Sequence, residues 1–355
     1  MKNLLLILLT IGTFSSCLKD ENLKQEFNGF TPQSITDDWQ ISTPANEHVD
    51  RDLLEKAYQL IYQDNRFLMA RSLLVFRNGK LIAEAYPNDK TDIDRIHNIQ
   101  SCTKSITSLM VGVAIQNNKI DSLDELLYSI YPEYFDEVQS KRTISIKDAL
   151  LMQTGLEFDN SVHTQQLYET SENSIEFVLK QPQIYTPGTI MKYNDGAPHL
   201  ISKVIEKKAN QTLSDYANSK LFSPLNITDW QWEYSKDNTT FGAFSLYLKP
   251  RDFGKIGQLL LQNGVWKNDT IIDTNYLSEA TSILTSANFN SEPYGYYFWI
   301  LPSFDAYCAL GHGGQFLLVA PNKNLVAVYT AFPYTNEQFW DERNELMNLL
   351  IESCK

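Results

Sequence analysis

Strand-forming sequence occurs in two distant parts of this chain, and this separation constrains the fold more than any other feature. Two β-rich runs cover residues 72–86 around Asn78-Gly79, a dipeptide typical of a two-residue hairpin turn. Strand patterns return after about residue 239, most clearly at 296–301, 306–310, 315–320 and 325–331. Residues from about 100 to 235 are predicted to form helices and irregular loops. We therefore expect an α+β fold: an antiparallel sheet built from the N- and C-terminal parts, flanked by helices, with a mostly helical inserted lobe.

Three segments have the spacing of apolar residues that is typical of helices. They cover residues 50–63, residues from Ser101 to the polar stretch 116–119, and residues 337–353. The second is almost wholly apolar on one side, which predicts a buried, central helix. The chain has 355 residues, 43% of them hydrophobic, enough to bury a large core. We expect one two-lobed catalytic domain at 46–355, with the helical lobe at about 100–235.

The first 17 residues have the pattern of an export signal. Met1-Lys2 is followed by the apolar run 4–11 and then by small residues ending at Cys17. A membrane-spanning helix needs about 20 consecutive apolar residues, so this shorter run is expected to be cleaved. Ser15-Ser16-Cys17 resembles a bacterial lipobox, which implies that the thiol of Cys17 is acylated and becomes the mature N-terminus. An ordinary secretory signal with an unrelated cysteine is the alternative.

The residues after this signal indicate how the mature chain would be tethered to a membrane. Residues 18–45 are polar, contain Pro32 and Pro44 and show no sustained periodicity, so we expect a flexible tether. Lys19-Asp20-Glu21 resembles a sorting signal that some Gram-negative bacteria use for surface lipoproteins. The expected location is the cell envelope, with a lipid anchor in the outer membrane and either a periplasmic or a surface face.

Charge and cysteine content exclude several classes of function. The net charge is −13 and no block of lysine or arginine interrupts the acidic background, so no nucleic-acid partner is expected. Apart from Cys17, the cysteines have neither C-x-x-C nor His-Cys spacing, and the histidines form no metal-binding pattern. We expect no disulfide framework, no metal and no cofactor, and we expect Cys102 to be a packed small residue.

The segment Ser101-Cys102-Thr103-Lys104 carries the clearest chemical signal. Serine is a weak nucleophile at neutral pH and needs a base within hydrogen-bond reach. Residues three apart lie on the same face of a helix, so the amine of Lys104 can lie beside the hydroxyl of Ser101. Burial of the lysine would lower its pKa and make it a plausible base. The short pattern S-x-x-K also occurs by chance, and a surface lysine is the alternative.

Residues 98–114, followed by 120–124, resemble the active-site helix of the serine β-lactamase and penicillin-binding protein superfamily. Further segments resemble this superfamily in the right order: 144–156, then Tyr185-Thr-Pro-Gly188 before Tyr193-Asn194-Asp195. The resemblance spans roughly residues 65–335 and implies a β-lactamase/transpeptidase-like fold. It implies that Ser101 is the nucleophile and that Lys104 and Tyr193 handle its proton. Asp195 stands where the superfamily has asparagine, and its carboxylate could keep Lys104 charged.

A third element, Gly311-His312-Gly313-Gly314-Gln315, corresponds by this resemblance to the K-T-G strand of the superfamily. The small residues would let an extended substrate lie along the strand edge. The backbone N–H groups of Gln315 and Ser101 would form an oxyanion hole. His312 replaces the lysine that holds a substrate carboxylate, which argues against a β-lactam as the natural substrate. A structural role for His312 is equally open.

The resemblance is greatest to the esterase and 6-aminohexanoate-oligomer hydrolase branch, on residues 230–232 and 242–257. It implies a serine hydrolase that cleaves an ester or amide of a small or short peptide-like substrate through an acyl-enzyme. A D-alanyl-D-alanine carboxypeptidase or β-lactamase is an alternative in the same fold. A catalytically idle lipoprotein that binds peptide or glycan is an alternative of another class.

Overall fold

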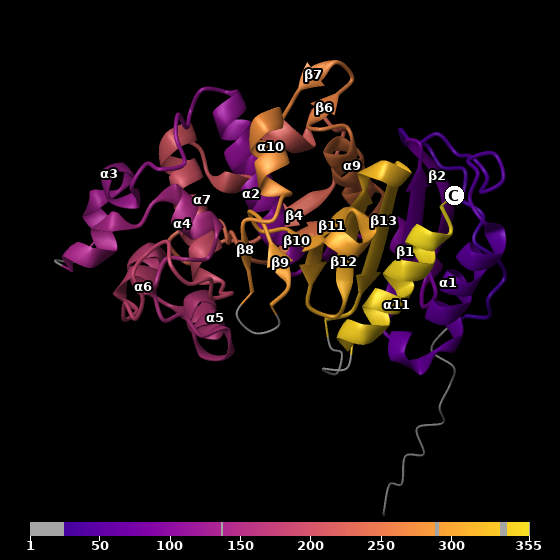
Figure 1. Ribbon diagram of the computed structural model, residues 1–355, viewed down its shortest axis with the longest axis horizontal. Coiled ribbons are helices and arrows are strands. Elements are labelled where there is room, and N and C mark those ends of the chain that lie inside the picture. Colours follow the sequence, from indigo (N-terminus) through magenta and orange to yellow (C-terminus); the bar gives the residue numbers. More distant parts are fainter. Residues whose placement is uncertain (1–24, 136–137, 288–290, 334–338, 355) are drawn as a thin grey trace, which may run out of the picture.

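The computed structural model describes residues 25–135, 138–287, 291–333 and 339–354. A large sheet with strands from both ends of the chain lies beside a lobe of helices, and α2 lies between them (Figure 1). The expected α+β architecture, with a sheet built from both ends of the chain and a helical inserted lobe, is therefore confirmed. The export signal and Cys17 lie outside the described residues. Within the described ranges, no helix is both long enough and apolar enough to cross a membrane.

The large sheet is antiparallel and joins the two ends of the chain. Its order is β2-β1-β13-β12-β11-β10-β9-β8, so that β1 from the N-terminal part pairs with β13 from the C-terminal part. The strands are β1 (Ala70–Arg77), β2 (Lys80–Ala85), β8 (Thr285–Ser286), β9 (Pro293–Tyr294), β10 (Trp299–Leu301), β11 (Ala306–Gly311), β12 (Gln315–Ala320) and β13 (Leu325–Ala331).

Local sequence explains the hairpin and the central strands. Asn78 and Gly79 have φ of 52° and 77°, the left-handed values that a two-residue hairpin turn requires. Every residue of β12 and β13 is buried, because α9 packs on this part of the sheet and α1 and α11 lie side by side over it (Figure 1). Strands covered on both faces have continuous apolar sequences rather than alternating ones.

Helices occupy the lobe and flank the sheet. The predicted helices 50–63, 101–119 and 337–353 correspond to α1, α2 and α11, although residues 337 and 338 lie outside the described ranges. Two helices in the C-terminal part, α9 and α10, were not expected. The helices are α1 (Arg51–Gln63), α2 (Cys102–Gln116), α3 (Leu127–Ile130), α4 (Ile146–Leu150), α5 (Asn160–Glu169), α6 (Ser174–Lys180), α7 (Gly196–Ala209), α8 (Leu213–Ala217), α9 (Pro250–Leu261), α10 (Thr274–Ala280) and α11 (Phe339–Glu352).

Residues 25–45, which we expected to belong to a flexible tether, instead lie against the domain. The backbone N–H of Leu81 donates to Gln40, and that of Ser42 donates to Leu81, along the edge strand β2. Phe30 is buried, and the indole N–H of Trp39 donates to the carbonyl of Arg251. An edge strand has unpaired backbone groups that an extended segment can satisfy. Such pairing needs no apolar periodicity, so the sequence pattern did not reveal it.

A small second sheet and a separate hairpin complete the described strands. The sheet has the order β3-β5-β4, and the hairpin pairs β6 with β7. This small sheet places the turn before α2, because β3 ends three residues before Ser101. The strands are β3 (His97–Asn98), β4 (Trp230–Trp232), β5 (Leu246–Leu248), β6 (Val265–Trp266) and β7 (Asp269–Thr270).

Candidate active site

Ser101 lies at the start of α2, directly after a tight turn. Gln100 has φ of 51°, a left-handed value that costs a non-glycine residue energy and is often found at functional sites. The backbone N–H of Gln100 donates to Oδ1 of Asn98 at 2.8 Å and stabilises this turn. The side chain of Ser101 does not cap the helix. Its hydroxyl is therefore placed at the positive end of the helix dipole, where developing negative charge is favoured.

The ammonium group of Lys104 is buried and has three oxygen acceptors. Its Nζ lies 2.8 Å from Oγ of Ser101, 3.1 Å from the carbonyl oxygen of Ala243 and 2.6 Å from Oδ1 of Asp195. The side chain is only 1% exposed. An ammonium has three protons and can donate to these oxygens, and the hydroxyl of Tyr193 is a further hydrogen-bond partner. The i, i+3 spacing on α2 thus places the amine beside the serine hydroxyl as predicted.

Two opposing effects determine the pKa of Lys104. Burial disfavours the ammonium and lowers the pKa, whereas the charge of Asp195 and the hydroxyl of Tyr193 raise it, and the balance lies above the usual value. The expectation that burial lowers this pKa is therefore not met, whereas the expectation that Asp195 could keep Lys104 charged agrees with their 2.6 Å contact and with the direction of the shift.

Tyr193 and Asp195 come from the segment that leads into α7. Nζ of Lys104 lies 5.0 Å from the centroid of the Tyr193 ring, which packs against Trp299 at 5.8 Å. Oδ2 of Asp195 accepts a hydrogen bond from Oγ1 of Thr164 at 2.6 Å. Tyr193 lies 92 positions after Ser101 in the chain, and the fold brings both residues to Lys104.

The carbonyl of Ala243 is presented by the segment 239–246, which runs along α2 and α7. Thr107 of α2 donates to the carbonyl of Gly242 at 2.7 Å, and Ser202 of α7 donates to that of Thr240 at 2.7 Å. The backbone N–H of Leu246 donates to Oγ1 of Thr103. The path of this segment is therefore fixed by hydroxyl groups on two helices.

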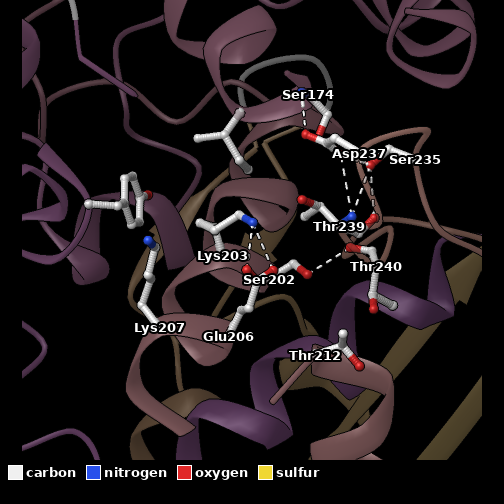
Figure 2. Close-up of polar contacts among 12 residues, drawn as sticks. Ser174, Ser202, Lys203, Glu206, Lys207, Thr212, Ser235, Asp237, Thr239 and Thr240 are labelled. Atoms are coloured by element: carbon white, nitrogen blue, oxygen red, sulfur yellow. Dashed lines mark hydrogen bonds and ion pairs between the residues drawn. The ribbon is translucent and has the colours of Figure 1, made fainter. Parts of the chain in front are cut away.

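A buried polar network stabilises the start of the same segment. Figure 2 shows Asp237 among Ser174, Ser235 and Thr239, and it shows Ser202 directed toward Thr240. The carboxylate of Asp237 accepts from the backbone N–H of Ser174 at 2.8 Å and from that of Thr239 at 3.3 Å. Hydrogen bonds to the carboxylate keep the pKa of Asp237 below its usual value despite burial. Ser174, Ser235 and Thr239 are buried, and Asp237 is half-buried.

The segment 311–315 forms the turn between β11 and β12 rather than the beginning of one strand. Gly313 and Gly314 have φ of 83° and 80°, values that favour glycine. A Cβ on Gly311 would lie 2.6 Å from the carbonyl oxygen of Ile99, so only glycine lets β11 come this close to the turn before Ser101. Gln315 is buried and its side-chain amide donates to the carbonyl of Asn98 at 3.0 Å.

The structure brings most of the predicted site residues together. Ser101, Lys104, Tyr193 and Asp195 are grouped around one ammonium, and Gln315 lies beside the turn before α2. His312 is exposed on the turn, with Gly313 and Gly314 after it. Cys102 is buried, as expected for a packed small residue. No group of three potential ligands suited to a metal ion occurs among the described residues.

Two contributors were not predicted. The carbonyl of Ala243 left no sequence signal, because any residue type supplies a backbone oxygen. Thr164 lies 63 residues from Ser101 on a helix without an amphipathic pattern, and no motif includes it.

Comparisons with known proteins give matches over much of the chain. The family model described as Beta-lactamase matches residues 69–352. The chain is 27% identical over 194 residues to the lovastatin esterase of Penicillium rubens, and the match covers 48% of each chain. The chain thus spans about half the length of that curated relative.

Solved structures show the same fold at low sequence identity. A putative 6-aminohexanoate-dimer hydrolase from Bacillus anthracis has a TM-score of 0.73 at 17% identity, over 93% of this chain and 91% of that one. A family VIII carboxylesterase has a TM-score of 0.70 at 16% identity, over 88% of this chain and 98% of that one.

Proposed function

Since this chain belongs to the Beta-lactamase family, we propose that it is a serine hydrolase that cleaves an ester or amide through an acyl-enzyme intermediate. The family and its esterase and hydrolase neighbours support the reaction class. The observation that carries the proposal is the 2.8 Å contact between Nζ of Lys104 and Oγ of Ser101 in a buried site. A hydroxyl held this way beside a second proton carrier is the arrangement that nucleophilic catalysis by serine requires.

In the proposed acylation step, Oγ of Ser101 attacks the substrate carbonyl and its proton passes to Tyr193. Lys104 keeps its charge, as its raised pKa supports. Its ammonium orients the serine hydroxyl and stabilises Tyr193 as a phenolate, which becomes the neutral phenol when it takes the serine proton. Tyr193 then returns the proton to the leaving alcohol or amine, and the carbonyl carbon remains bound to Ser101.

Deacylation reverses these roles. Water takes the place of the leaving group, gives its proton to Tyr193 and attacks the acyl carbon. The acid leaves when the proton returns to Oγ of Ser101. The backbone N–H groups of Ser101 and Gln315 are the proposed donors to the oxyanion in both steps, aided by the dipole of α2.

An ordinary ester or amide is a better proposed substrate than a β-lactam. His312 is exposed and stands where the superfamily has a lysine, so the turn 311–315 offers no fixed ammonium for a substrate carboxylate. A small or short peptide-like acyl compound needs no such contact. Covalent labelling with a fluorescent penicillin at saturating dose would favour the carboxypeptidase or β-lactamase alternative.

We also propose that the chain is a lipoprotein of the cell envelope, acylated at Cys17 after removal of residues 1–16. The support is the sequence pattern alone. Growth of an expressing bacterium with a radiolabelled fatty acid should label the wild-type chain and leave Cys17→Ala unlabelled. Equal labelling of both chains would contradict the anchor.

The proposed chemistry is tested by intact-mass analysis of the chain lacking residues 1–17 after incubation with a fluorophosphonate. We expect one adduct, accompanied by turnover of p-nitrophenyl esters, and loss of both in Ser101→Ala. Ser140→Ala, at an exposed serine, is the matched control and should behave as wild type. Absence of both adduct and turnover in the wild type would refute the hydrolase and favour an idle binding protein.

A further inference from the structure

Helix α5 lies against the candidate active site with little apolar contact to hold it there. Of its residues 160–169, only Leu167 is buried. Asp159 caps the first turn of α5, and other residues of this helix make hydrogen bonds and ring contacts to the rest of the chain. A helix with such a small buried face depends on specific side-chain contacts for its position.

Two of these contacts lead to Asp195, the acidic partner of Lys104. Oδ1 of Asn160 accepts the backbone N–H of Asp195 at 2.8 Å, and Oγ1 of Thr164 donates to Oδ2 of Asp195 at 2.6 Å. Asn160 and Thr164 are four residues apart and so lie on one face of α5. Each oxygen of the Asp195 carboxylate therefore has its own donor, because Oδ1 lies 2.6 Å from Nζ of Lys104.

A third contact joins the next turn of α5 to the segment that carries Ala243. Tyr168 stacks on Phe241, with ring centroids 5.3 Å apart and an interplanar angle of 14°. Its hydroxyl donates to Glu233 at 3.0 Å. Helix α5 thus contacts the supports of two acceptors of the Lys104 ammonium, Asp195 and Ala243.

We propose that Thr164 is a positioning residue for catalysis, which acts on Lys104 through Asp195. This inference rests on the proposed function. Asp195 is 10% exposed at its side chain, so water is poorly placed to replace a missing donor to Oδ2. Without that donor, the carboxylate is free to rotate away from Lys104. The ammonium then loses the partner that fixes its direction toward Ser101.

The test compares Thr164→Val with Thr164→Ser in p-nitrophenyl ester hydrolysis. Valine keeps the shape and removes the donor, and we expect kcat/KM to fall about 10-fold to 100-fold, the range for a hydrogen bond to a charged group. Serine keeps the donor and should stay within about threefold of wild type. Thr270→Val, at an exposed position on β7, is the matched control for the same chemical change.

One further readout separates positioning from a loss of folding. In an Asp195→Asn background, Thr164→Val should change kcat/KM by less than about threefold, since its target has gone. A reduced fraction of folded enzyme would instead lower kcat by the same factor in both backgrounds and leave KM unchanged.

The outcomes decide between the two proposals. Wild-type turnover that depends on Ser101, together with an unaltered Thr164→Val enzyme, would overturn the positioning role and leave the hydrolase standing. Equal effects of Thr164→Val with and without Asp195 would overturn it as well. Absence of turnover that depends on Ser101 in the wild type would overturn both.

Discussion

His199 should make the unfolding free energy of this protein depend on pH between 4 and 6.5. The side chain is fully buried on α7, where Nε2 lies 2.8 Å from Oγ of Ser174 and the ring packs near Phe241 at 5.7 Å. Burial disfavours the imidazolium and lowers the pKa of His199 from 6.5 to about 4, despite the nearby charge of Asp237.

The magnitude follows from the two pKa values. Above pH 6.5 the imidazole is neutral in both states and contributes no pH dependence. As the pH falls from 6.5 to 4, the unfolded chain binds a proton that the folded chain does not, so the folded state loses about 1.4 kcal/mol per pH unit. Between 6.5 and about 4 this amounts to about 3 kcal/mol. Below pH 4 both states bind the proton and the loss levels off.

The assay is urea unfolding at pH 7 and pH 4 of the wild type and of His199→Gln, both lacking residues 1–17. Glutamine does not titrate and can still bond to Ser174, whereas the other titrating groups contribute equally to both chains. We expect the wild type to lose about 3 kcal/mol more than the variant. His48→Asn, at an exposed histidine, should lose as much as wild type. Equal losses in wild type and His199→Gln would refute the reasoning.

Three further changes test the site and its support. Gly311→Ala would place a Cβ 2.6 Å from the carbonyl oxygen of Ile99 and displace the turn before Ser101. We expect kcat for p-nitrophenyl esters to fall about 100-fold in protein whose circular dichroism is normal. An unchanged kcat would contradict this close approach. Tyr193→Phe should lower kcat about 100-fold to 10,000-fold with little change in KM, and a wild-type rate would remove tyrosine from the proton path. Arg251→Met should lower the free energy of unfolding in urea by about 3–5 kcal/mol, because the buried carboxylate of Glu84 loses its ion-pair partner at 2.6 Å. A loss below about 1 kcal/mol would show that solvent replaces the pair.

The sequence predicted those elements of the fold whose local pattern agrees with their packing. The Asn78-Gly79 hairpin and helix α2 have the turn residues and apolar spacing that their positions require. Helix α9 was missed, and its Gly254 and Gly257 are one reason, since glycine disfavours helix. In the structure these glycines allow close packing, because a Cβ on either would lie 2.4 Å from Phe76 or Val326.

The candidate site was predictable to the extent that its chemistry is local or has a short motif. Ser101 and Lys104 are three residues apart, so helix geometry places them together. Tyr193 was found through the Pro-Gly that precedes its motif. The resemblance raised the possibility that Asp195 keeps Lys104 charged, but helix spacing alone could not show it, because the effect depends on Asp195 being 2.6 Å away in the folded chain. Contacts of that kind are a property of the whole fold.

The pairing of residues 40–42 along β2 has a consequence for shortened forms of this protein. A chain that began at residue 46, or at residue 69 where the family match starts, would present β2 as a bare strand able to join a second copy. It would also leave Arg251 without Asp37, its partner at 2.7 Å. We therefore expect such truncations to self-associate through β2, whereas chains that retain residues 25–45 stay dispersed. On this reasoning, residues 25–45 prevent aggregation by covering the edge of β2, in addition to any role as a tether.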